Sequence, residues 1–378
     1  MLQNDELISV AAIGNVAKKS TFSGIPFHFY HTLLAKGYQA EPWQMDTEKL
    51  KIKRIVWNLC KSLGGQQPGG FQYSRQFAQS LIKQIPDRLL TGKVVSFNQH
   101  FPTFSQVKEK NGKLYPYIDA TFRQLLERYG VSKQIGRKIR DSALAAEEEY
   151  FHSVPRIFTF QQWAKDSLIH DYGVEEHKVK VVLPGANLIF EPSYHANIKK
   201  EVESLGKSNP LILGFVGKDW KRKGLLVLAD VRDELERRGW NVTIRCVGNA
   251  PSDFARRKGV EFVGFIEKET RQREFINFLE SCDIGCLFSE AEFSSISVLE
   301  FISVGRPVAG FVVDGMGDLF LPDLSITFNP SDSIKLIADG FDKYLQDTSY
   351  RRSMNTNAVL SCNYVRWSRA VDELVTEL

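Results

Sequence analysis

The sequence predicts an α/β protein with two doubly wound domains, each a parallel sheet between layers of helices. Short apolar runs alternate with helix-like patterns, which is typical of βαβ units. The alternation stops at about 187–210, where Pro, Gly and charged residues gather, and then starts again. A chain of 378 residues is long enough for two cores of ordinary size. We expect domains at 1–190 and 210–353, a linker at 191–209, and a C-terminal helix at 354–378 that packs back toward the first domain.

The first domain is expected to alternate strands and helices from its first apolar run onward. The strand patterns lie at 8–13, 38–43, 94–97, 114–118, 157–160 and 179–183. Apolar residues at helical spacing predict helices at 27–35, 73–85, 122–129, 137–151 and 163–172. The loops that follow the strands are the places to look for function, because open α/β sheets bind ligands there.

The second domain repeats this pattern. Its expected strands lie at 211–216, 242–247, 260–265, 284–288 and 307–313, and its expected helices at 225–238, 270–281 and 295–304. Two such domains facing one another would form a cleft at the C-terminal edges of both sheets.

Composition limits the class of protein. Lys and Arg total 49 against 45 Asp and Glu, and a net charge of +4 is too small to predict nucleic-acid binding. Five cysteines, an odd number without a C-x2-C pair, indicate reduced thiols. The N-terminus has no signal-peptide pattern, and no run of eighteen apolar residues occurs. We expect a cytoplasmic protein.

The segment E-F-S-S-I-S-V-L-E, from Glu292 to Glu300, follows a predicted strand and leads into a predicted helix. Ser294 or Ser295 is expected to cap this helix and Gly305 to end it. One carboxylate then lies on the loop and the other about two turns into the helix, near free backbone N–H groups. Such a place suits an anionic ligand with hydroxyls, although two glutamates eight apart are also common on helix surfaces.

The loop G-K-D-W-K-R-K-G, at 217–224, also follows a predicted strand in the same domain. Lys218 and Lys223 could neutralise a diphosphate, and Gly217 and Gly224 would let the backbone come close to it. A solvated basic turn is the alternative for such a charge run. Together with the glutamates, the loop points to a nucleotide sugar.

These motifs resemble those of the retaining GT-B glycosyltransferases of glycosyltransferase family 4, the group 1 glycosyl transferases. That family has a G-R-x4-K-G loop, a V-x-F-x-G strand, and an E-x7-E motif followed by G-x-P-V. The matching residues here are Gly217-Lys218, Lys223-Gly224, V-E-F-V-G at 260–264, Glu292, Glu300, Gly305, Pro307 and Val308. S-G-I-P at 23–26, the stretch 170–187 and Trp367 resemble further parts of the family pattern.

The resemblance implies a role for each matching residue. Lys218 and Lys223 would stabilise the leaving diphosphate, Glu292 would bind hydroxyls of the donor sugar, and Glu300 would bind the ribose. Backbone N–H groups of four residues would face the sugar and the diphosphate: Phe293, Ser294, Ser295 and Ile296. Gly24 would let the N-terminal loop approach the phosphates.

Two positions depart from the family pattern. Lys218 stands where the family has an arginine, and it offers a point charge in place of a two-pronged fork. Asp119, in Y-I-D-A-T-F, stands where many members have a histidine that faces the sugar. Asp119 could contact a sugar hydroxyl or orient the acceptor, or it could be the N-cap of the helix that follows.

The resemblance implies transfer of a sugar, with retention of its anomeric configuration, to a glycan, lipid or small-molecule acceptor. No cofactor and no metal are expected, because the chain has no D-x-D motif and His28 and His31 lack accompanying carboxylates. A GT-B phosphorylase or epimerase and a non-catalytic GT-B binding partner remain as alternatives.

The segment 50–63 is basic and amphipathic, with cations at Lys51, Lys53, Arg54 and Lys61. The favoured interpretation is an ordinary surface helix with one face packed on the sheet. The alternative is peripheral contact with an anionic membrane, at its inner face.

Overall fold

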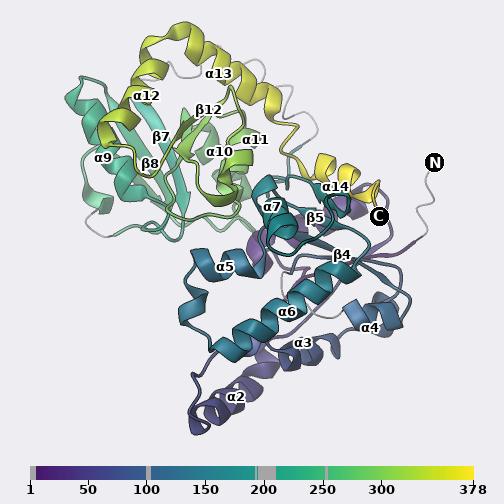
Figure 1. The fold of residues 1–378 in the computed structure, drawn as a ribbon. Coiled ribbons are helices and arrows are strands. Elements are labelled where there is room, and N and C mark those ends of the chain that lie inside the picture. Colours follow the sequence, from purple (N-terminus) through teal and green to yellow (C-terminus); the bar gives the residue numbers. More distant parts are fainter. Residues whose placement is uncertain (1–5, 99–103, 192–193, 195–209, 252–253) are drawn as a thin grey trace. The chain divides into compact units, whose positions relative to one another are not determined.

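The computed structural model describes residues 6–98, 104–191, 194, 210–251 and 254–378. The chain forms two compact α/β units, Met1–Pro184 with Ala370–Leu378, and Gly185–Arg369 (Figure 1). The predicted linker at 191–209 lies outside the described residues except for Glu191 and Tyr194. The cleft between the two domains stays a prediction.

The N-terminal unit is a six-stranded sheet in the order β2-β1-β3-β4-β5-β6, and every neighbouring pair is parallel. The strands are β1 (Ile8–Ala11), β2 (Ala40–Pro42), β3 (Lys93–Ser96), β4 (Lys113–Ile118), β5 (Ile157–Thr159) and β6 (Val179–Val181). The α-helices are α1 (Ile25–Ala35), α2 (Lys51–Leu63), α3 (Arg75–Ile82), α4 (Phe104–Glu109), α5 (Phe122–Arg128), α6 (Arg137–Ser153) and α7 (Gln162–His170). The predicted strands and helices are thus present, each with ends within three residues of the predicted ones.

The last residues of the chain belong to the N-terminal unit, as the fold prediction required. Lys36 Nζ lies 2.8 Å from Asp372, Lys180 Nζ lies 2.9 Å from Glu377, and the Tyr115 hydroxyl donates to Leu378 O at 2.9 Å. A single helix over 354–378 is wrong, however. Helix α13 (Thr348–Ser361) ends before α14 (Trp367–Val375) begins, and no Gly or Pro marks the break.

The C-terminal unit has a second parallel sheet, in the order β12-β11-β10-β7-β8-β9. Its strands are β7 (Leu211–Gly217), β8 (Val242–Gly248), β9 (Val260–Gly264), β10 (Ile284–Leu287), β11 (Val308–Phe311) and β12 (Ser325–Phe328). Its helices include α9 (Leu225–Arg237), α10 (Gln272–Glu280), α11 (Ile296–Ser303) and α12 (Ile334–Gln346). The chain runs from β7 outward to β9 and returns to β10 beside β7. The order of the strands therefore reverses between β7 and β10, which is where open α/β sheets bind their ligands.

Helix α11 is held close to the sheet by Phe301. A Cβ added at Gly285 of β10 would lie 2.3 Å from the Phe301 ring, and one at Gly214 of β7 would lie 2.7 Å from it. Side chains at these two places would push the helix outward. Small residues in the strands thus fix the position of α11 over the point where the strand order reverses.

Among the described residues, no helix combines the length and the apolar character that crossing a bilayer would need.

A buried polar cluster joins α5, α6 and the turn that follows α7 in the N-terminal unit. The Glu147 carboxylate accepts from Phe122 N, at 2.9 and 3.0 Å, and from the Tyr172 hydroxyl. Burial raises the pKa of Glu147 from 4.5 to about 8, and these hydrogen bonds oppose the rise only in part. Glu147 thus fixes the N-terminal end of α5 while holding a proton near neutral pH.

This raised pKa predicts that the fold loses stability as the pH rises. The folded protein binds the Glu147 proton more tightly than the unfolded chain does, so the contribution is complete below pH 4.5 and is lost as the pH passes about 8. We expect the free energy of unfolding to fall by more than about 1 kcal/mol over that range. Glu147→Gln should flatten this dependence when urea unfolding is followed against pH. Glu148→Gln, an exposed neighbour, is the control, and equal slopes in all three proteins would contradict the assignment.

Candidate active site

Two loops meet where the strand order of the C-terminal sheet reverses, one after β7 and the other after β10. Glu290 N donates to Arg222 O at 3.1 Å and so joins them through the backbone. Gly224 has φ +73°, and a Cβ there would lie 2.0 Å from Phe288 O. Glycine is therefore needed for the loops to approach this closely.

Glu292 is the centre of the contact between the loops. Its side chain accepts at one oxygen, Oε2, from Lys223 Nζ and from Arg222 Nη1, each at 3.1 Å, and from Ser289 Oγ at 3.3 Å. Glu292 is 8% exposed. Arg222 Nη1 also donates to Ala291 O at 2.6 Å. Two cations of the predicted phosphate-binding loop thus converge on the first glutamate of the E-x7-E motif.

The sequence prediction named Lys223 and Glu292 but missed Arg222. The one signal for Arg222 was its place in a run of cations. Such a run does not indicate which of its side chains points toward Glu292. Lys218 lies elsewhere, with its Nζ 4.9 Å from the centroid of the Phe265 ring. Gly217 leaves room for the neighbouring cation, because a Cβ there would lie 2.7 Å from Lys223 Cδ. The structure therefore joins Lys223, and not Lys218, to Glu292.

The N-terminal end of α11 differs from its prediction. Ser295 is the N-cap residue, but its side chain does not cap the helix and its Oγ lies 2.9 Å from Ser297 Oγ. Ser294 Oγ is enclosed and has no hydrogen-bond partner among the described residues. Gly305 ends the helix as predicted, with φ +73° and a bond from its N–H to Ile302 O at 2.9 Å. The N-cap side chain thus accepts from none of the first N–H groups of α11, at a helix end that favours anions.

Glu300 forms a separate ion pair in the same unit. Its side chain is fully buried, and Lys268 Nζ lies 2.7 and 2.8 Å from its two oxygens. The ammonium of Lys268 also lies 4.2 Å from the centroid of the Phe275 ring. Burial raises the pKa of Glu300 above its ordinary value, and Lys268 opposes this rise. Lys268 follows β9 and belongs to no motif, so nothing in the sequence singled it out.

Gly24 and Asp119 lie in the N-terminal unit, each after a strand. Gly24 has φ +84° and follows Phe22 and Ser23, which also have positive φ, at 44° and 57°. Non-glycine residues in this conformation are strained and are common at functional loops. Asp119 is half-buried directly after β4.

The alternative role of Asp119, as a helix N-cap, is wrong. The N-cap of α5 is Thr121, whose hydroxyl accepts from Gln124 N while Gln124 reaches back to Thr121 N. Asp119 therefore lies on the loop before the cap.

The Lys268–Glu300 ion pair gives a prediction about stability. Lys268→Met should destabilise the protein by about 3 kcal/mol, because it leaves a buried carboxylate without its cation. Adding Glu300→Gln should restore much of the loss, which thermal unfolding of the single and double variants measures. Lys258→Met, at a lysine whose side chain is 91% exposed, is the control. Additive losses in the double variant would show that the two residues do not depend on each other.

Comparisons with known proteins find similar sequences and similar folds. Residues 210–347 match the family model described as Glycosyl transferases group 1. A curated relative, the D-inositol 3-phosphate glycosyltransferase of Kribbella flavida, is 24% identical over 240 residues, which make up 59% of this chain and 56% of the relative. This chain thus covers little more than half of that protein's length.

Solved structures share the fold over nearly the whole chain. Sucrose-phosphate synthase from Thermosynechococcus elongatus superposes with a TM-score of 0.69 at 12% identity, covering 98% of this chain and 97% of that one. HepE of Anabaena, in complex with UDP, gives 0.61 at 13% identity, covering 99% and 100%. The chain therefore has the two-domain GT-B fold, and its C-terminal unit matches the group 1 glycosyl transferases, as the sequence resemblance predicted.

Proposed function

We propose that this chain is a retaining, metal-independent glycosyltransferase. It would move a sugar from a nucleotide diphosphate sugar to a glycan, lipid or small-molecule acceptor. The observation that carries this proposal is the convergence of Lys223 and Arg222 on Glu292 Oε2 beside the reversal of strand order. Cations for a diphosphate and a carboxylate for hydroxyls then lie in one place.

The two cations suit a leaving diphosphate. The side chains of Lys223 and Arg222 are only 16% and 28% exposed, so water screens their charge less than at an open surface. Charge that develops on the diphosphate would be stabilised by groups already in position. The N-terminal end of α11, without a side-chain cap, adds backbone donors from 293–296.

The two glutamates suit hydroxyl groups. Among the described residues, the contacts of Glu292 fall on Oε2, which leaves Oε1 to accept from a sugar hydroxyl. Glu300 would accept from the ribose, sharing its oxygens with Lys268. Gly24 would let the strained loop at 21–24 approach the phosphates, and Asp119 would contact a sugar or acceptor hydroxyl.

The reaction would then need no covalent link to the protein. The bond between the anomeric carbon and the diphosphate oxygen breaks, and a bond to the acceptor oxygen forms on the same face. The acceptor's hydroxyl proton passes to the departing diphosphate, which Lys223, Arg222 and Lys218 would hold. Catalysis would consist of charge stabilisation and alignment.

The relatives suggest which donor to try first. HepE has been solved with UDP, with UDP and glucose, and with UDP-glucose. We therefore choose UDP-glucose as the first probe, followed by other UDP, GDP and ADP sugars.

The proposal predicts the effect of removing one cation. Lys223→Ala should lower sugar transfer by at least about tenfold, because the leaving diphosphate loses a cation in an enclosed site. The melting temperature should change little, because Arg222 still pairs with Glu292. Lys221→Ala removes an exposed cation from the same loop and is the matched control. Turnover is measured as release of nucleoside diphosphate that depends on an acceptor.

Other outcomes would reject the assignment. Unchanged turnover in Lys223→Ala would remove Lys223 from the site. Release of nucleotide without any acceptor, or a need for free phosphate, would favour an epimerase or a phosphorylase. Binding of nucleoside diphosphate without turnover on a broad acceptor panel would favour a non-catalytic binding partner.

A further inference from the structure

Helix α2 carries its apolar residues on its outer side. Ile52, Ile55, Val56, Leu59 and Leu63 recur at helical spacing and therefore share one face. Each of them is between 52% and 87% exposed, and the helix contains no buried residue. Figure 1 shows α2 at the edge of the N-terminal unit. An apolar face exposed along a whole helix is unusual in a water-soluble domain and indicates a partner.

The opposite side of α2 attaches the helix to its own unit. Trp57 Nε1 donates to Gly69 O at 2.9 Å, Asn58 Oδ1 accepts from Gly69 N at 2.9 Å, and the Trp57 ring lies 5.7 Å from that of Phe71. The favoured sequence interpretation expects a surface helix with one face packed on the sheet; the helix does pack on its unit, but through Trp57 and Asn58 and not through its aliphatic residues. Hydrophobic periodicity defines a face but does not tell which way it points, and here polar residues and one tryptophan make the attachment.

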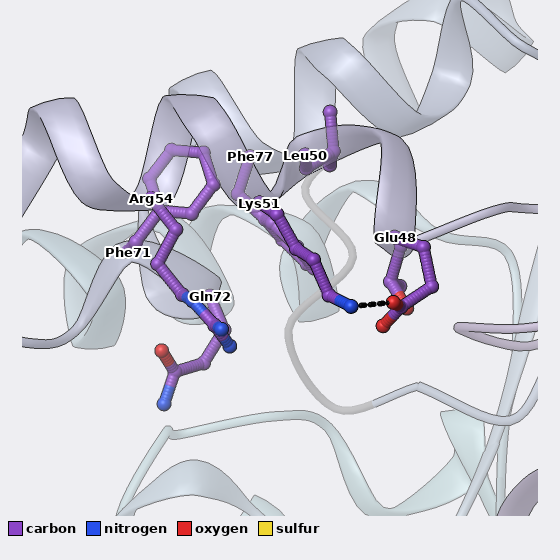
Figure 2. Close-up of a pocket in the computed structure, with 8 residues that line it drawn as sticks. Glu48, Leu50, Lys51, Arg54, Phe71, Gln72 and Phe77 are labelled. Carbon is purple, nitrogen blue, oxygen red and sulfur yellow. Dashed lines mark ion pairs between the residues drawn. The ribbon is translucent and has the colours of Figure 1, made fainter.

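Lys51 and Lys53 border the apolar face at helical spacing, whereas Arg54 and Lys61 lie on the attached side, where Lys61 Nζ is 4.8 Å from the centroid of the Trp57 ring. The helix has Lys51, Lys53, Arg54 and Lys61 and no acidic residue. Lys53 donates to Ser80 Oγ and Lys61 to Gln66 Oε1, and both acceptors are neutral. Lys51, the first residue of α2, pairs with Glu48, which lies three residues earlier in the short turn before the helix (Figure 2). The helix thus keeps a net positive charge beside its apolar residues.

Two hollows flank the helix. One, of about 260 Å³, is lined by Lys51 and Arg54 of α2, by Glu48, which pairs with Lys51, and by Phe71 and Phe77 (Figure 2). The other, of about 530 Å³, is lined from α2 by residues of both kinds: Ile52, Lys53, Val56, Trp57, Cys60 and Lys61. Each hollow thus places cations next to apolar walls, the two kinds of surface that a phospholipid headgroup and the start of its acyl chains require.

We propose that α2 binds this protein to the surface of an anionic phospholipid bilayer. The helix lies in the plane of the interface with Ile52, Ile55, Val56, Leu59 and Leu63 among the acyl chains. The long stems of its lysines let their ammonium groups reach the headgroup phosphates. This inference goes beyond the proposed transferase and does not rest on it.

Charge complementarity selects a lipid surface over a second copy of this chain. Pairing two α2 faces would bring Lys51 and Lys53 of both helices together, with no acidic residue on either helix. A bilayer with anionic lipids supplies both an apolar layer and negative charge. The attachment through Trp57 and Asn58 keeps the helix in place before it meets the membrane, so binding needs no rearrangement of the unit.

Vesicle sedimentation tests the proposal with the full chain. Wild-type protein should sediment with phosphatidylcholine–phosphatidylglycerol vesicles at low salt, less at high salt, and little with phosphatidylcholine alone. Ile55→Ser with Leu59→Ser should weaken partitioning by at least about tenfold, because two inserted apolar side chains are lost. Lys51→Gln with Lys53→Gln, at the two cations that border the apolar face, should reduce the preference for anionic vesicles.

Matched controls change equally exposed residues of the C-terminal unit. Leu336→Ser with Leu360→Ser removes two exposed leucines, and Lys258→Gln with Lys335→Gln removes two exposed cations. Both controls should partition like wild type, and all variants should keep their melting temperature. Binding by wild type to neither vesicle, or equal loss in controls and α2 variants, would overturn the proposal. A dimer in light scattering that the Ile55/Leu59 variant dissociates, without vesicle binding, would assign the face to a second copy instead.

Discussion

The candidate site depends on the ion pairs that Glu292 Oε2 makes with Lys223 and Arg222. Two cations held near each other in a partly enclosed place need an anion, and here one carboxylate oxygen serves both. Removing the partner of a buried charge costs about 3–5 kcal/mol, less where some water remains. In the protein without donor, Glu292 supplies the anion. A donor diphosphate could take over this role, which would leave the carboxylate to accept hydrogen bonds from the sugar.

Backbone features bring these three residues together. The reversal of strand order puts the loops after β7 and β10 next to each other, although Arg222 and Glu292 are 70 positions apart in the chain. Gly224 lets the loops approach, and Phe301 packed over Gly285 sets the position of α11. The charges therefore rest on a scaffold defined by small residues. A substitution that increased the distance between β7 and β10 would separate Lys223 and Arg222 from the Glu292 carboxylate.

Most of the fold was readable from the sequence, and the site only in part. Fully buried parallel strands give continuous apolar runs, so the predicted strands were found, whereas edge strand β12 and helix α12 were not anticipated. Lys223 and Glu292 were predicted, but the turn of Arg222 toward Glu292 depends on contacts between distant loops. For α2 the periodicity was correct, but it did not indicate which way the apolar face points, because packing decides that direction.

Calorimetry of nucleoside diphosphate binding to Glu292→Gln tests the central claim most directly. If the Glu292 carboxylate pairs with the cations that a diphosphate needs, its replacement by a neutral amide should leave Lys223 and Arg222 available to the diphosphate. We then expect UDP, or whichever of UDP, GDP and ADP binds best, to bind several-fold more tightly to Glu292→Gln than to wild type. The heat of binding should be larger at low salt than at high salt. Unchanged or weaker binding would contradict the claim that Glu292 and the diphosphate share Lys223 and Arg222.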